Sequence, residues 1–267
     1  MAEECSPIGI FDSGVGGLTV CRQIAWRLPD EHLVYLGDTA RVPYGTKSPE
    51  TVIRYARACA EVLLGHHIKL LVVACNTASS CAIAPLREAL DIPVIGVIGP
   101  GARAAAAKTR GGGIGVIGTD STIASGAYPR SIAAVEPDIA VHCRACPLFV
   151  PLAEEGWTAG EVPEAVARTY LGGLAELGID TLVLGCTHYP LLRETIACTM
   201  GPAVALVDSA EETAAVAEQT LDAAGLRRPS AGTPTHRFLV SDGPARFATV
   251  GRRFFGAALD SVTWVDF

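Results

Sequence analysis

The chain has 267 residues, of which 49% are hydrophobic and 18% are charged, and its formal net charge is −7. This composition is typical of a folded protein of one large or two modest domains, and it excludes extensive disorder. The acidic charge disfavours nucleic acid and anionic membrane as partners. No apolar run approaches the roughly 18 residues of a spanning helix, and Glu3 and Glu4 occupy the place of a signal peptide's basic residues, so we expect a cytoplasmic protein.

Ten short segments rich in Val, Ile and Leu are predicted to be strands, because Gly, Pro or Asp bounds them and most are apolar on both faces. In chain order they are 8–11, 33–35, 70–74, 94–97, 114–117, 139–142, 181–184, 205–207, 237–240 and 262–265. Helical periodicity is clearest in 51–66, 162–177 and 210–224. The alternation of strands and helices predicts an α/β fold with parallel sheets covered by helices.

The chain contains an internal similarity. Residues 8–13 resemble 114–119, and residues 71–77 resemble 182–187, so that each half has an apolar strand ending in a cysteine, Cys75 or Cys186. Parallel strands are commonly alike in composition, and periodicity alone is therefore weak evidence for duplication. The matched cysteines favour two related halves.

Cys75 and Cys186 stand out among the nine cysteines because ligands of open α/β sheets bind outside the carboxyl ends of the strands. Each is followed by a possible helix cap, Thr77 or Thr187, so we expect each thiol near a helix N-terminus, where the dipole favours the thiolate. A single cysteine in such a place is more often structural. Two cysteines in equivalent places predict reactive thiols.

Other motifs are weaker candidates. Residues 113–118 have the glycine spacing of a dinucleotide-binding fingerprint, but these glycines lie within a predicted strand and do not follow it, so we treat the match as chance. Residues 14–17 indicate a tight turn that lets the backbone approach a small ligand. His142, Cys143 and Cys146 have metal-ligand spacing without a second pair, so we expect no metal. A pyridoxal phosphate enzyme needs a Schiff-base lysine, and none follows a predicted strand.

Several motifs together resemble those of the glutamate racemases, within the cofactor-independent aspartate/glutamate racemase family. In family order they are DSGVGGLT at 12–19, GDT at 37–39 with PYG at 43–45, ACNTA at 74–78, CPL at 146–148 leading to Glu154, and GCTHYPLL at 185–192. The resemblance covers almost the whole chain. It implies an isomerase that interconverts L- and D-glutamate without a cofactor and supplies D-glutamate for peptidoglycan, and hence for cell-wall biogenesis and cell shape.

The resemblance also implies two flavodoxin-like domains related by a pseudo-twofold axis, with the active site in the cleft between them. The expected limits are 1–97 plus 208–267 for the first domain and 98–207 for the second. Glutamate is the implied small-molecule partner, and a homodimer is one implied assembly.

The resemblance assigns two catalytic thiols, because inversion removes a proton from one face of the α-carbon and delivers one to the other face. Cys75 would take the proton from D-glutamate and Cys186 from L-glutamate. Asp12 and His188 would tune the thiols, and Asp38 and Glu154 would be further acidic members of the site. The structural alternatives are that Asp12 and Asp38 only form turns and that Glu154 lies at the solvated start of a helix. The implied substrate-binding residues are Asp12, Ser13, Tyr44, Gly45, Asn76, Thr77, Thr187 and His188.

Three alternatives stay open. The first is a related aspartate racemase, or another amino-acid racemase with the same two cysteines; those enzymes usually have a glutamate where this chain has His188. A non-catalytic regulatory protein of the same fold would be expected to lose a thiol, and both are present. A metal protein built on His142, Cys143 and Cys146 is the third.

Overall fold

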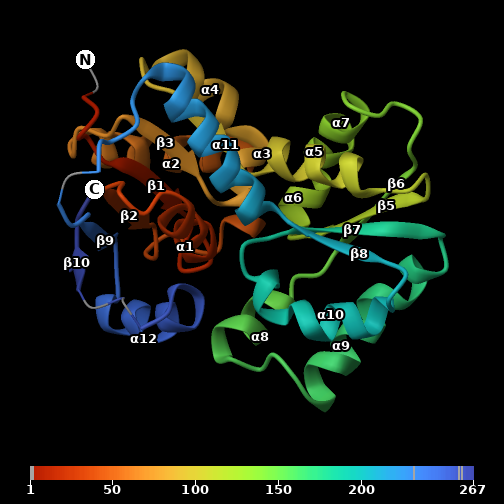
Figure 1. The fold of residues 1–267 in the computed structure, drawn as a ribbon. Helices are drawn as coiled ribbons and strands as arrows, with labels where there is room; N and C mark the ends of the chain where they lie inside the picture. Colours follow the sequence, from red (N-terminus) through yellow and green to blue (C-terminus); the bar gives the residue numbers. More distant parts are fainter. Residues whose placement is uncertain (1–2, 231, 258, 260) are drawn as a thin grey trace.

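The strands form two sheets, and every described pairing is parallel. The computed structural model describes residues 3–230, 232–257, 259 and 261–267. The first sheet, in the order β10-β9-β2-β1-β3-β4, and the second, in the order β6-β5-β7-β8, occupy different halves of the molecule (Figure 1). The strands are β1 (Ile8–Asp12), β2 (Leu33–Gly37), β3 (Leu70–Val73), β4 (Val94–Gly96), β5 (Gly113–Gly118), β6 (Val141–Ala145), β7 (Ile179–Gly185), β8 (Ala205–Asp208), β9 (His236–Val240) and β10 (Val262–Trp264).

Helices cover both sheets. They are α1 (Leu18–Arg27), α2 (Pro49–Leu64), α3 (Asn76–Cys81), α4 (Ile83–Ala89), α5 (Ile98–Lys108), α6 (Asp120–Ala124), α7 (Ala127–Ala133), α8 (Phe149–Glu155), α9 (Glu161–Ala175), α10 (Arg193–Met200), α11 (Ser209–Ala224) and α12 (Pro244–Phe255), with short 3₁₀ turns η1 (Tyr44–Thr46) and η2 (Tyr189–Leu192). The predicted α/β fold with parallel sheets is confirmed.

The two sheets share a strand order. β2-β1-β3-β4 in the first corresponds to β6-β5-β7-β8 in the second, which is the flavodoxin-like arrangement 2-1-3-4. β9 and β10, from the end of the chain, extend the first sheet beside β2. β4 ends at Gly96 and β8 at Asp208, close to the expected domain limits, which stay a prediction.

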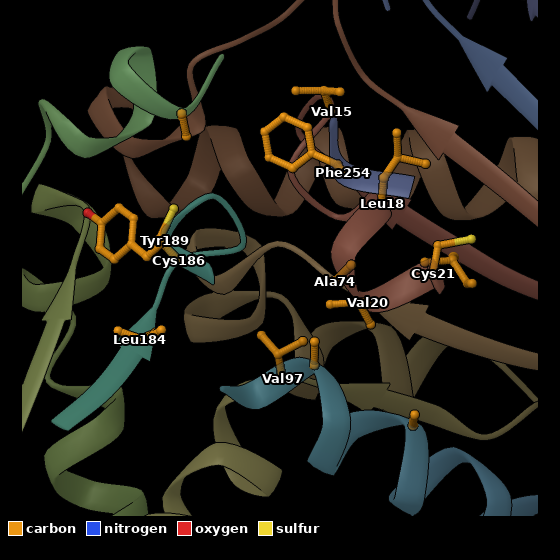
Figure 2. Close-up of a cluster of buried hydrophobic side chains, with 14 of the residues drawn as sticks. Val15, Leu18, Val20, Cys21, Ala74, Val97, Leu184, Cys186, Tyr189 and Phe254 are labelled. Carbon is orange, nitrogen blue, oxygen red and sulfur yellow. The ribbon is translucent and has the colours of Figure 1, made fainter. Parts of the chain in front are cut away.

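One cluster of buried side chains continues from one half into the other. It contains Leu18 of α1 and Phe254 of α12 together with Leu184 of β7 and Tyr189 of η2 (Figure 2). The cluster also includes Cys186, so the end of β7 is anchored in apolar packing contributed by both halves. A rigid, close-packed surrounding of this kind fixes side chains within narrow limits.

Most predicted boundaries lie within two residues of the structure, but the sixth strand is shifted. The sequence predicts 139–142, whereas β6 runs from Val141 to Ala145 and pairs with β5 from Ile114 to Gly118. β6 is an edge strand, and the polar residues His142 and Arg144 therefore belong to it although they interrupt the apolar run. Helix α2 ends at Leu64, two residues before the predicted end.

Within the described residues, no helix combines the length and the apolar character that crossing a membrane requires.

Candidate active site

A cavity of about 410 Å³ lies between the two halves at the carboxyl ends of four strands. Ser13 and Cys75 follow β1 and β3 of the first sheet, and Thr119 and Cys186 follow β5 and β7 of the second. β1 pairs with β3, and β5 with β7, so each pair of residues is brought to one sheet edge. Both strand-end cysteines line this cavity, whereas a larger hollow of about 700 Å³, bordered by α4, α5 and α7, contains neither.

Cys75 is itself the N-terminal cap of helix α3. Its Sγ accepts a hydrogen bond from the backbone N–H of Ala78 at 3.5 Å, and the thiol donates to Ser13 Oγ at 3.6 Å. The predicted position at a helix N-terminus is confirmed, but Thr77 is not the cap. Burial raises the pKa of Cys75 to about 12, the charge of Asp12 adds to the rise, and these two hydrogen bonds oppose it. The Cys75 sulfur therefore carries a proton at neutral pH.

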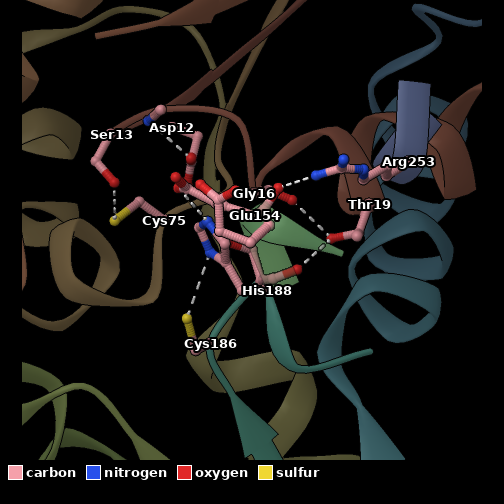
Figure 3. A network of polar contacts seen from close by, with 12 residues as sticks. Asp12, Ser13, Gly16, Thr19, Cys75, Glu154, Cys186, His188 and Arg253 are labelled. Atoms are coloured by element: carbon pink, nitrogen blue, oxygen red, sulfur yellow. Dashed lines mark hydrogen bonds and ion pairs between the residues drawn. The ribbon is translucent and has the colours of Figure 1, made fainter. Parts of the chain in front are cut away.

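Cys186 contacts a histidine and, through it, a carboxylate (Figure 3). Cys186 Sγ lies 3.7 Å from His188 Nδ1, and His188 Nε2 lies 3.0 Å from Glu154 Oε1. Burial lowers the pKa of His188, but its hydrogen bonds with Cys186 and Glu154 outweigh burial and raise it to about 10. The imidazolium in turn lowers the pKa of Glu154. A positive charge thus stands beside the Cys186 sulfur.

The prediction that Thr187 caps a helix after Cys186 is wrong. No α-helix begins there; the chain enters the 3₁₀ turn η2, whose cap position is His188 without a side-chain cap bond. The backbone oxygen of Thr187 instead accepts a hydrogen bond from Thr19 Oγ1 of α1 at 3.1 Å, across the two halves.

Asp12 is buried behind the cavity wall. Its Oδ2 accepts a hydrogen bond from the backbone N–H of Gly14 at 2.9 Å, which is the turn-forming role considered above, while Oδ1 has no hydrogen-bond partner in the described part of the chain. Burial raises the pKa of Asp12, against the opposing charge of His188 and backbone N–H bonds. Asp12 therefore both shapes the turn and acts electrostatically on Cys75.

Of the predicted residues that follow β2, some line the cavity and one supports them from behind. Tyr44 and Gly45 line the cavity, but Asp38 does not. Asp38 is fully buried and accepts hydrogen bonds from the Tyr44 hydroxyl at 2.5 Å and from the Ser241 hydroxyl at 2.9 Å. The structure thus places Asp38 one layer behind the cavity, where it holds Tyr44, rather than with the thiols.

Hydroxyl and amide groups complete the cavity wall. The Thr77 and Thr119 hydroxyls are 3.0 Å apart and both lie near the hydroxyl of Thr122. Asn76 accepts a hydrogen bond from Tyr128 at its Oδ1, at 2.8 Å, which leaves the buried Nδ2 donor without a partner among the described atoms. The cavity wall thus offers neutral donors from both halves.

Sequence reasoning missed Thr119 and Asp120, which line the cavity from the second half. The internal similarity contains the signal, because Thr119 is the counterpart of Ser13. Val150 and Pro151 of α8 were also missed, because their apolar side chains carry no recognisable chemical pattern. Pro147, which precedes α8, lies in the CPL motif but was not assigned to the site.

The predicted alternative of a metal site finds no matching geometry in residues 3–230, 232–257, 259 and 261–267, where no three His, Cys, Asp or Glu side chains are grouped to hold an ion. His142 and Cys143 are neighbours along β6 and so point to opposite faces of the strand. Cys146 is buried, and its thiol donates to the backbone oxygen of Arg144 at 3.7 Å.

Comparison with known proteins identifies the family of the chain. Residues 8–217 match the family described as Asp/Glu/Hydantoin racemase. The chain belongs to this family. Similarity to individual members of the racemase family extends over nearly the full length: the chain is 60% identical to a glutamate racemase of Geobacter metallireducens over 259 residues, which cover 97% of this chain and 96% of that protein.

Solved structures of the racemase family have the same fold. An isoform of glutamate racemase from Bacillus anthracis superposes with a TM-score of 0.95 at 42% identity, covering 99% of both chains. The Francisella tularensis glutamate racemase in complex with D-glutamate gives 0.92 at 38% identity, covering 98% of both. An aspartate racemase from Picrophilus torridus, at 18% identity and a TM-score of 0.55, shares the fold alone. The present chain is thus a racemase, an isomerase.

Proposed function

We propose that the protein interconverts L- and D-glutamate by proton transfer between two cysteines at the α-carbon. The observation that carries the proposal is that Cys75 and Cys186, at equivalent strand ends of two sheets, line one cavity. The similarity to glutamate racemases, at 60% identity for one of them, supports glutamate as the substrate.

Inversion starting from L-glutamate needs Cys186 as thiolate and Cys75 as thiol. The Cys186 thiolate accepts the α-proton, the electron pair delocalises into the α-carboxylate, and the Cys75 thiol delivers its proton to the opposite face. Cys186 is then a thiol and Cys75 a thiolate, and the reverse reaction uses the roles exchanged. The high pKa of Cys75 supports its protonated state at the start of this direction.

The carbanionic intermediate must be stabilised without a cationic side chain from lysine or arginine, because neither lines the described cavity. Neutral donors remain: the Ser13, Thr77, Thr119 and Thr187 hydroxyls and the free Nδ2 of Asn76. Preorganised donors of this type are effective where water is excluded. We assign them to the substrate carboxylates, with Tyr44 and Gly45 beside them.

His188 is proposed to stabilise negative charge on Cys186. An imidazolium beside a thiolate forms an ion pair, and Glu154 keeps His188 protonated through the 3.0 Å contact. Asp12 is proposed to act on Cys75 through its charge, which favours the thiol. From its place behind the cavity wall, the same charge is proposed to favour binding of the α-ammonium group of the substrate. The positive charge of that ammonium group would offset the unfavourable effect of Asp12 on the Cys75 thiolate.

In the cell, the proposed product is D-glutamate for peptidoglycan, made in the bacterial cytoplasm. The domain limits 1–97 plus 208–267 and 98–207 are proposed as the two bodies between which the substrate binds. A homodimer stays a prediction.

The substrate assay compares purified protein with L- and D-glutamate and with L- and D-aspartate, measured by circular dichroism without added pyridoxal phosphate. We expect both glutamate enantiomers to reach the racemate and aspartate to react at least about 10-fold more slowly, since a site matched to one chain length rejects a substrate shorter by one methylene by about 10- to 200-fold. Comparable rates for aspartate, or no change in glutamate, would contradict the proposal.

A further inference from the structure

The unit formed by Cys186, His188 and Glu154 belongs to the second half, but part of its support comes from helix α12 of the first. α12 follows β9 and lies next to α8 in the fold (Figure 1). Phe254 of α12 is fully buried, and its ring meets the His188 ring edge to face, at 5.3 Å between centroids and 80° between planes. This contact restricts rotation of the imidazole, because an aromatic edge against a ring face has a preferred geometry.

Arg253, the residue before Phe254 in α12, contacts Glu154, the partner of His188. Arg253 Nη1 donates a hydrogen bond to the backbone oxygen of Glu154, near the C-terminal end of α8 (Figure 3). Carbonyls in the last turn of a helix lack partners inside the helix and favour a cation. α8 ends at Glu155 and is capped by Gly156, whose φ is 78°; a Cβ on Gly156 would lie 3.2 Å from Arg253 Nε and Cζ. Glycine at this position therefore leaves space for the guanidinium.

These contacts are consecutive in sequence and converge on one interaction. Arg253 fixes the backbone of Glu154, and Phe254 fixes the ring of His188. The side chains of Glu154 and His188 then meet at 3.0 Å. A shift of α12 would disturb both partners together. We propose that Arg253 and Phe254 are positioning residues that hold the Glu154–His188 pair against Cys186 from the opposite half of the molecule.

Only the expected effect of Arg253 and Phe254 on turnover rests on the proposed function. The charged and titratable groups that act on His188 are Cys186 and Glu154, by direct contact, and Asp12, by its charge. Arg246 of α12 also acts on Glu154 by its charge. Loosening the Glu154–His188 contact removes a bond that favours the imidazolium, so it must lower the pKa of His188.

The test titrates His188 by NMR in the full-length protein, with labelled histidine, and measures kcat and KM for glutamate across pH. For Arg253→Ala we expect the pKa of His188 to fall by about half a unit or more, and kcat to fall about 5- to 20-fold with KM changed less than about twofold. Arg253→Lys should recover part of both. Phe254→Leu should lower kcat while the protein stays folded, because leucine keeps the apolar contact but not the ring edge.

The matched control is Arg252→Ala, which removes the same charge from the adjacent, exposed position. It should leave the His188 titration and kcat unchanged. An Arg253→Ala protein whose His188 titrates as in the wild type overturns the proposal, even if kcat is reduced, because the role would then be structural only. If the wild type does not racemise glutamate, the proposed function fails, while the titration still decides the role of Arg253.

Discussion

Replacement of either Cys75 or Cys186 by alanine is expected to lower kcat for glutamate racemisation by about 10²- to 10⁴-fold, since each thiol supplies a general acid or base of that worth. Both directions must suffer equally in kcat/KM, because the two enantiomers have the same free energy. The serine variants should be similarly inactive, since a hydroxyl is far less acidic than a thiol. The measurement is the rate of optical change from each enantiomer.

Folding should survive these cysteine changes, because each sulfur faces a cavity rather than a packed contact on every side. Cys198→Ala is the control: Cys198 is an exposed cysteine of α10 and should leave kcat unchanged. If the Cys75 or Cys186 alanine variant retained more than about a tenth of wild-type kcat, well outside the range for loss of a catalytic acid or base, the two-thiol mechanism would be wrong.

Gly16→Ala is expected to have the next largest effect, although residue 16 has no functional group. A Cβ at this position would lie 2.3 Å from Thr187 Oγ1 and 2.4 Å from His188 Nδ1. The imidazole cannot move aside freely, because it is held by Cys186 and Glu154. We expect kcat to fall about 100-fold from misplacement of His188, and the free energy of unfolding to fall by about 1–3 kcal/mol from overpacking.

The control for Gly16→Ala is Gly172→Ala in α9, where a Cβ would meet no atom within 4 Å. Alanine there should stabilise the helix by about 0.5–1 kcal/mol and leave kcat unchanged. Thermal unfolding and steady-state kinetics of both variants decide the matter. Near-wild-type kcat in Gly16→Ala would mean that the position of His188 relative to Cys186 is unimportant for turnover.

The sequence predicted the features that depend on local pattern. Buried parallel strands are apolar on both faces, which identified the sheets, and the repeated strand-end cysteine identified Cys75 and Cys186 as a pair. The edge strand β6 was misplaced because its half-exposed residues lack that pattern.

The features that depend on how the halves meet could not be predicted. Thr77 and Thr187 are typical capping residues, yet the Cys75 sulfur caps α3 and the chain after Cys186 forms no α-helix. Asp38 was expected near the thiols but supports Tyr44 from behind. The contact of Gly16 with His188 joins segments from different sheets, and no spacing in the sequence encodes it.

The most direct test of the two-cysteine mechanism is hydrogen exchange during the first turnovers in deuterated water, followed by mass spectrometry of the separated enantiomers. Starting from L-glutamate, the account predicts that D-glutamate carries deuterium at the α-carbon from the outset, because Cys75 delivers a solvent-derived proton, while recovered L-glutamate keeps its original hydrogen. Early appearance of deuterium in recovered L-glutamate at a rate equal to that in the product, or product that retains the original hydrogen, would contradict it, since a single base would then serve both faces.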